Sequence, residues 1–161
     1  MLAVAFALGA TPSWLGKREL FRWPFGGFLR WLGGVPVDRS ARRGLVGEAV
    51  ARFAEAERLF LVIPPSGTRA RADHWKSGFY HVARGAEVPI VCAYLDYHER
   101  IGGIGLVMWP TGNVREDMDR IRAFYASKRG KCPAQTTPVR LREEDVDTAQ
   151  APARRAHLGG R

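Results

Sequence analysis

Cysteine is scarce in this sequence, which has only Cys92 and Cys132 among its 161 residues. Disulfide scaffolds and structural zinc sites need several cysteines at short, regular spacings, and two distant thiols provide neither. The sequence therefore predicts a reducing compartment and no metal site. Because Cys92 lies within an apolar run, we expect its thiol to be buried and inert.

Long apolar runs and nucleotide-binding motifs are also missing. Residues 1–10 are apolar, but they reach only about half the length of a membrane span and lack the basic start of a secretory signal. We expect them to form a core helix and any membrane contact to be peripheral. Neither G-x4-G-K-[ST] nor G-x-G-x-x-G occurs, which argues against the usual nucleotide-binding loops.

Negative charge is in short supply. The chain has 16 acidic residues against 25 lysines and arginines, a net charge of +9. This excess predicts attraction to nucleic acid, to an acidic membrane surface or to phosphorylated ligands. With 46% hydrophobic residues, the composition is otherwise that of a globular domain with a sizeable core.

Apolar and amphipathic segments alternate along the chain. We expect strands at residues 13–16, 35–37, 59–63, 88–95 and 104–109, and helices at residues 24–32, 41–57, 77–84 and from 114. Asn113 and Glu116 are spaced as a capping box, and Gly102-Gly103 predicts a break in the chain. The alternation predicts an α/β fold, a mixed sheet flanked by helices. We expect this domain to span 1–133 and a polar, disordered tail to span 134–161.

Aromatic residues are concentrated between residues 19 and 34. Phe25 and Phe28 share one predicted helix face, whereas Trp23 and Trp31 fall outside it beside arginines. Two interpretations remain open. The tryptophans close the edge of the core, or they form a surface that contacts a membrane interface.

A basic loop follows the predicted strand at 59–63. Two prolines exclude a helix there, Gly67 permits a tight bend, and Arg69, Arg71 and Lys76 bring positive charge. Backbone N–H groups and fixed cations at the end of a strand are suited to holding an anion. The sequence therefore predicts an anion-binding loop at this point.

Three blocks follow one another in a specific order. The first includes Lys17-Arg18-Glu19-Leu20-Phe21 and ends with Val35-Pro36-Val37-Asp38-Arg39, the second is Pro65-Ser66-Gly67-Thr68-Arg69, and the third is Val88-Pro89-Ile90-Val91. In this order they resemble the blocks of the glycerolipid acyltransferases of the lysophosphatidate type, whose signatures include P-E-G-T-R and V-P-I-V. The resemblance covers residues 12–133.

The resemblance implies an acyltransferase of phospholipid biosynthesis. Such an enzyme moves a fatty acyl group from acyl-CoA or acyl carrier protein to a lysophospholipid such as 1-acylglycerol-3-phosphate. It needs no cofactor besides the acyl donor. It would be cytoplasmic and peripheral, on the inner face of a membrane.

The resemblance also implies roles for single residues. Arg69 and Arg39 match the arginines that hold the acceptor phosphate, and Lys17 and Lys76 match basic positions beside them, where a solvated role is equally open. Pro65, Ser66, Gly67 and Thr68 would shape the loop. Ser66 replaces the usual glutamate of the signature, which leaves the acceptor undefined.

The family's catalytic base is absent from this chain. That base is the histidine of an H-x4-D motif, and none of the four histidines has an aspartate five positions later. No catalytic residue is therefore assigned. Residues 1–6 resemble the helix that follows the motif, so we expect it upstream of Met1 in a longer form.

Two other hypotheses remain. Without the base, the chain would be a non-catalytic phosphate- or lipid-binding domain, or a gene fragment. Its positive charge would also suit a nucleic-acid-binding protein. No recognised nucleic-acid motif accompanies that charge, so we do not expect nucleic acid as a partner.

Overall fold

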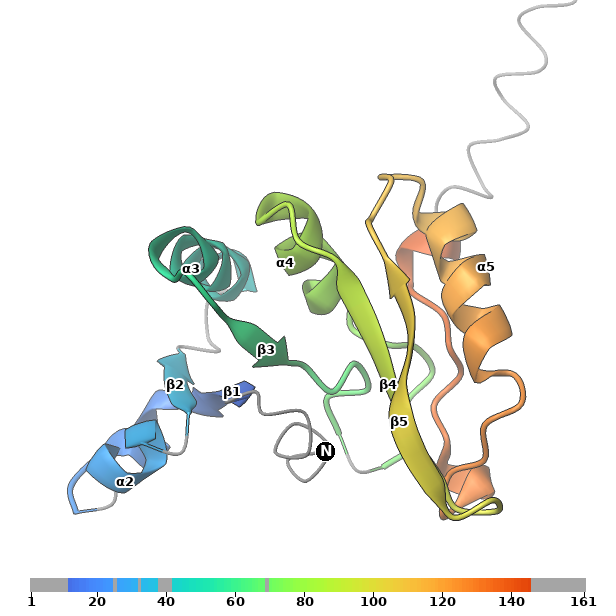
Figure 1. Ribbon diagram of the computed structural model, residues 1–161, viewed down its shortest axis with the longest axis horizontal. Coiled ribbons are helices and arrows are strands. Elements are labelled where there is room, and N and C mark those ends of the chain that lie inside the picture. The colour runs from blue at the N-terminus through green and yellow to red at the C-terminus, as the bar shows by residue number, and fades with distance from the viewer. Residues whose placement is uncertain (1–11, 25, 32, 38–41, 69, 146–161) are drawn as a thin grey trace, which may run out of the picture. The chain divides into compact units, whose positions relative to one another are not determined.

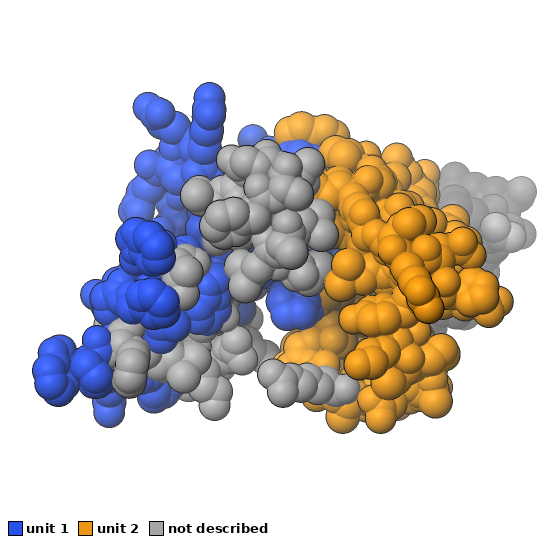
Figure 2. Space-filling view, turned by 60° about the horizontal axis from the view of Figure 1, so that its bottom comes forward, with its two compact units in different colours: residues 1–64, 78–89 blue, residues 65–77, 90–161 orange. Residues whose placement is uncertain are grey.

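The computed structural model describes residues 12–24, 26–31, 33–37, 42–68 and 70–145. Its contacts divide the chain into two units, coloured separately in Figure 2. Unit 1 comprises Met1–Pro64 and Gly78–Pro89, and unit 2 comprises Pro65–Ser77 and Ile90–Arg161. The helix predicted at residues 1–10 lies outside the described residues.

Unit 1 is built on a three-stranded parallel sheet. Its strands are β1 (Pro12–Lys17), β2 (Gly34–Val37) and β3 (Phe60–Val62), arranged in the order β2-β1-β3. All three were predicted from their short apolar runs. Trp14 lies in the central strand and pairs with Gly34 on one side and Val62 on the other.

The described residues of unit 1 also form four helical elements. They are η1 (Arg18–Phe21), α2 (Gly26–Trp31), α3 (Arg42–Glu55) and α4 (Gly78–Gly85). Phe21 is buried, and its ring lies 5.8 Å from that of Trp14. Helices α3 and α4 pack closely, since a Cβ atom at Gly85 would lie 3.0 Å from a methyl group of Val50.

Unit 2 is built on an antiparallel hairpin and one helix. Strand β4 (Ile90–Asp96) pairs with β5 (Ile101–Met108), and Figure 1 shows α5 (Val114–Tyr125) along the hairpin. The Tyr125 hydroxyl donates a 2.9 Å hydrogen bond to the Ala93 carbonyl. Cys92 is buried as predicted, and burial raises the pKa of its thiol.

The predicted capping box is present at the start of α5. The Glu116 N–H donates to the Asn113 side-chain oxygen at 3.3 Å, and the Asn113 amide donates to the Glu116 carboxylate at 3.2 Å. Each residue therefore satisfies a polar group of the other.

The predicted α/β class is confirmed, because the described residues form helices together with parallel and antiparallel strands. These strands lie in two small sheets, one parallel and one antiparallel, and not in the one mixed sheet that was expected. The break expected at Gly102-Gly103 does not occur, because both glycines lie inside β5 and pair with Leu95 and Tyr94. The Leu95 side chain occupies the space beside Gly102, since a Cβ atom at Gly102 would lie 2.7 Å from a Leu95 methyl group.

The predicted polar tail is also wrong over residues 134–145. Here η2 (Pro133–Gln135) is followed by a segment in which Thr137 and Leu141 are buried, and Leu141 forms a bridge with Trp75. Charged neighbours concealed these buried positions in the sequence pattern. Residues 146–161 lie outside the described residues.

Candidate anion-binding site

The loop after β3 is held in shape by its own side chains. The Ser66 hydroxyl donates to the Thr68 carbonyl at 3.2 Å, and the Thr68 hydroxyl accepts the Ala70 N–H at 3.2 Å. Gly67, at φ +63°, adopts the left-handed conformation that other residues avoid. The two hydroxyls and the glycine together fix a tight turn.

Lys76 lies against this turn. Its N–H donates a 2.8 Å hydrogen bond to the Pro65 carbonyl. A Cβ atom at Gly67 would lie 2.8 Å from Cε and 3.0 Å from Nζ of Lys76, so the exposed lysine side chain passes directly over the glycine. The structure thereby brings an ammonium group to the predicted anion-binding loop.

Of the other cations among the predicted site residues, the structure describes only the backbone of Lys17. Lys17 is the last residue of β1 and pairs with Val37, but its side chain lies outside the described residues. Arg39 and Arg69 also lie outside them. Of the predicted site residues, the structure therefore brings together Pro65, Ser66, Gly67, Thr68 and Lys76.

The strand ends of unit 1 share one edge. Because β1, β2 and β3 are parallel, their last residues Lys17, Val37 and Val62 all lie toward the same side of the sheet. Val37 leads into Asp38-Arg39, and Val62 leads toward the Pro64-Pro65 turn. Parallel sheets bind ligands beyond this edge.

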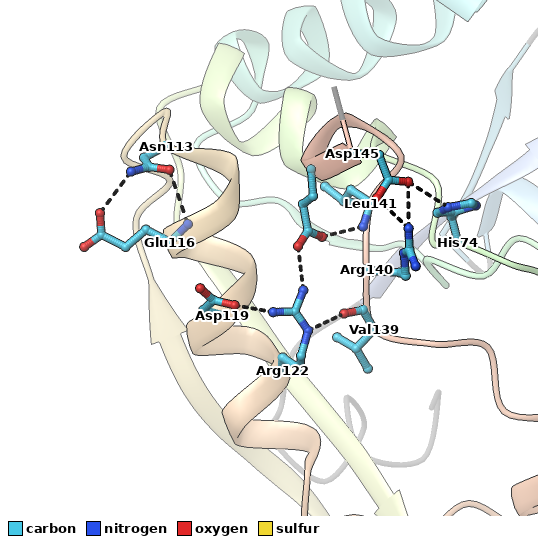
Figure 3. Close-up of polar contacts among 10 residues, drawn as sticks. His74, Asn113, Glu116, Asp119, Arg122, Val139, Arg140, Leu141 and Asp145 are labelled. Carbon is cyan, nitrogen blue, oxygen red and sulfur yellow. Dashed lines mark hydrogen bonds and ion pairs between the residues drawn. The ribbon is translucent and has the colours of Figure 1, made fainter. Parts of the chain in front are cut away.

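A histidine–aspartate pair that the sequence did not predict lies beside the loop. His74 Nε2 is 3.4 Å from an Asp145 oxygen, and Arg140 donates to the same carboxylate at 2.6 Å. The hydrogen bond from Arg140, supported by His74, holds the pKa of the Asp145 carboxyl below its usual range. Asp145 therefore lies in an ion-pair network (Figure 3).

The remaining described histidines lie elsewhere. His81 is exposed on α4 and its ring meets that of Tyr80 edge-on. His98 follows β4, where its N–H donates to Asp96 and its ring lies 3.7 Å from Glu99. Neither contact resembles a histidine oriented by an aspartate for proton transfer.

Sequence reasoning missed the residues that contact the loop from the far end of the chain. Thr137, Arg140 and Asp145 were assigned to a polar tail, although all three bond to residues 72–75 or to one another. The one local signal was Leu141, an apolar residue among charges that is fully buried.

Together, the parallel strands and the basic loop define an α/β protein with a candidate anion-binding turn. A comparison with family models gives a match to the family described as Acyltransferase over residues 1–96, more than half of the chain. The chain belongs to this acyltransferase family, which confirms the resemblance noted from its three blocks. No curated protein and no solved structure matches it.

The family match includes every predicted site position, from Lys17 to Lys76. It ends at Asp96, the last residue of β4. Strand β5, helix α5 and residues 134–145 thus lie beyond the matched range.

Proposed function

We propose that this chain is an acyltransferase of the glycerophospholipid type. It would take a fatty acyl group from acyl-CoA or acyl carrier protein and transfer it to a lysophospholipid such as 1-acylglycerol-3-phosphate. The observation that carries the proposal is the turn at residues 65–68, with Lys76 over Gly67, inside the family match.

The turn would hold the phosphate of the acceptor. Arg69 can bind a phosphate through two parallel hydrogen bonds, and Lys76 adds a point charge beside it. By the family resemblance, Arg39 and Lys17 would supply further positive charge.

The hairpin offers a surface for an acyl chain. One face of β4–β5 is covered by α5, and side chains alternate between the faces of a strand. Val91 and Val107 pair directly on the other face and are 45% and 55% exposed, and Leu95 and Ile104 continue the patch. Exposed apolar patches of this kind mark ligand or membrane contacts.

The aromatic segment of unit 1 supports a peripheral membrane location. Trp23 is 93% exposed and Trp31 80% exposed, and Arg22 and Arg30 are exposed beside them. These exposures favour the membrane-interface interpretation over packing in the core. Among the helices that the structure describes, none is long and apolar enough to cross a membrane. We propose attachment to the cytoplasmic face.

In the reaction, the acceptor hydroxyl oxygen would form an ester bond with the acyl carbon while the thioester C–S bond breaks. The hydroxyl proton passes to a base, and the sulfur leaves as a thiol. General-base catalysis contributes roughly 10²–10⁴-fold to such a step. Because the 161 residues include no H-x4-D motif, a non-catalytic phosphate- or lipid-binding domain is the second candidate function.

Acyl transfer from oleoyl-coenzyme A to lysophosphatidate tests the proposal. We would assay the 161-residue chain beside a form whose reading frame is extended upstream to include any H-x4-D block. We expect transfer by the extended form. Transfer by both forms would show that a residue within the 161 acts as base, with His74 the first to replace. Binding of lysophosphatidate without transfer by either form would favour the binding domain.

A further inference from the structure

A C-terminal strap, defined as residues 136–145, runs beside the segment that carries the anion-binding loop. Both belong to unit 2. The strap lies beyond the family match, which ends at residue 96. Any support that it gives to the loop therefore comes from a part of the chain outside the matched range.

The strap bonds to the loop segment at successive points. The Thr137 hydroxyl accepts the Ala72 N–H at 3.1 Å, and the Arg140 carbonyl accepts the Trp75 N–H at 2.8 Å. Leu141, fully buried, pairs with Trp75 as a parallel bridge. Asp145 adds the ion pair with His74. Two of these contacts fix loop backbone N–H groups.

The strap is in turn anchored on α5, as Figure 3 shows. Arg122 donates to the Val139 carbonyl at 3.1 Å and to the Glu144 carboxylate at 2.5 Å. The other Glu144 oxygen accepts the Leu141 N–H at 2.6 Å. One arginine therefore ties the strap at two points to a helix whose Met118 and Ile121 are fully buried.

The support continues from the strap to the turn itself. Trp75, held by the strap, also meets the Tyr125 ring edge-on at 5.7 Å. The next residue, Lys76, bonds to Pro65 and lies over Gly67. An unbroken series of contacts thus runs from α5 through the strap and residues 72–76 to the turn.

We infer that the C-terminal strap positions the anion-binding turn. Thr137 is a positioning residue, because its hydroxyl holds the Ala72 N–H. Through residues 72–76, this contact fixes where Lys76 lies relative to Gly67. The identity of the ligand as a phosphate monoester rests on the proposed function. The claim that the strap fixes the loop backbone is independent of that function.

The test compares Thr137→Val with Thr136→Val in the full chain. Valine keeps the volume of threonine but cannot accept the Ala72 N–H. Thr136 is a matched control because it is exposed and its hydroxyl bonds to the Cys132 carbonyl instead. Three quantities are measured for each variant: the amide hydrogen exchange rates over residues 70–77, the unfolding midpoint, and the affinity for a lysophosphatidate with a six-carbon acyl chain. Thr137→Ser, which restores the hydroxyl, is the rescue.

Loss of one hydrogen bond should speed exchange of the Ala72 and Trp75 amides about fivefold. We expect the affinity for the lysophosphatidate to fall roughly threefold to tenfold, since a displaced Lys76 loses part of a charge-assisted hydrogen bond. Thr137→Ser should restore both values, and Thr136→Val should change neither.

Unchanged exchange in Thr137→Val would overturn the inference, as would faster exchange with unchanged affinity for the lysophosphatidate. If the unsubstituted chain does not bind the lysophosphatidate, the proposed function fails, and exchange alone then decides whether the strap holds the loop. Should Thr137→Val not fold, Asp145→Ala replaces it. Asp145 is exposed, and its loss frees His74 and Arg140 without opening the core.

Discussion

At the scale of single residues, Gly67 decides whether the turn can form. It combines a φ of +63° with the close passage of Lys76, so a side chain would be strained and would also displace the lysine. We expect Gly67→Ala to lower the free energy of unfolding by about 1–2 kcal/mol, as a left-handed alanine costs. Urea denaturation measures this change.

Gly47→Ala provides the matched control for that substitution. Gly47 lies within α3, and a Cβ atom there would meet nothing within 4 Å. Alanine should raise the stability by about 0.5–1 kcal/mol, because glycine weakens a helix interior. Equal effects of the two substitutions would contradict the geometry described for the turn.

Asp96 is a second residue whose surroundings make a measurable difference. Its buried carboxylate accepts backbone N–H groups from His98, Glu99 and Arg129 at 2.9–3.2 Å. The bond from Glu99 contributes most to a pKa below the usual range. The carboxylate form is therefore favoured in the folded protein.

The sign of the resulting pH dependence follows from this lowered pKa. The stabilisation is fully present above the unfolded pKa, about 3.9, and is lost as the pH falls through the lower folded value. We expect Asp96→Asn to flatten the fall in unfolding free energy below pH 4, measured by denaturant titration across pH values. Part of the pH dependence should remain in this variant, because the pKa of Asp145 is also lowered. An unaltered slope would show that Asp96 is not a source of this dependence.

At the scale of elements, α5 supports both the hairpin and the strap. Its first turn depends on Asn113, so we expect Asn113→Ala to cost about 1 kcal/mol of unfolding free energy. Asn113→Ser keeps an acceptor for the Glu116 N–H and should remain near the original stability. Thermal unfolding of the two variants compares them, and equal losses would argue against the cap.

Elements with a strong local signal could be predicted from the sequence. Helices α3 and α5 follow from apolar residues at helical spacing, and the Asn113–Glu116 box marks where α5 begins. Strands β1 to β4 follow from short apolar runs. In each case the signal lies within the segment that forms the element.

Pairing between distant segments could not be predicted in the same way. Gly102-Gly103 has a poor strand propensity, but both glycines pair with β4, where the Leu95 side chain lies over Gly102 and the Tyr94 side chain over Gly103. The strap joins Trp75 through the backbone of Arg140, and a backbone contact leaves no mark on residue type. The motif therefore located the turn, but not its support.

At the scale of the whole molecule, the net charge of +9 and the exposed tryptophans predict binding to anionic membranes. We expect the double substitution Trp23→Ala, Trp31→Ala to weaken binding to phosphatidylglycerol vesicles roughly tenfold or more, by loss of interfacial apolar area. Vesicle co-sedimentation at low salt measures this.

Trp109→Ala is the control for the membrane prediction. Trp109 is 61% exposed but follows β5 in unit 2, away in sequence from the aromatic segment. It should leave vesicle binding nearly unchanged. An equal loss in both proteins would mean that exposed tryptophans contribute without regard to position.

The account's central claim is that the P-S-G-T-R turn binds the phosphate of the acceptor. Calorimetry can compare a six-carbon lysophosphatidate with the monoacylglycerol that lacks its phosphate, on the full chain and on Arg69→Ala. We predict that the phosphate improves affinity roughly 10-fold to 100-fold in the unsubstituted chain, as charge-assisted hydrogen bonds do, and that Arg69→Ala removes most of this gain. Equal affinity for the two ligands, or a gain that survives the loss of Arg69, would contradict the claim.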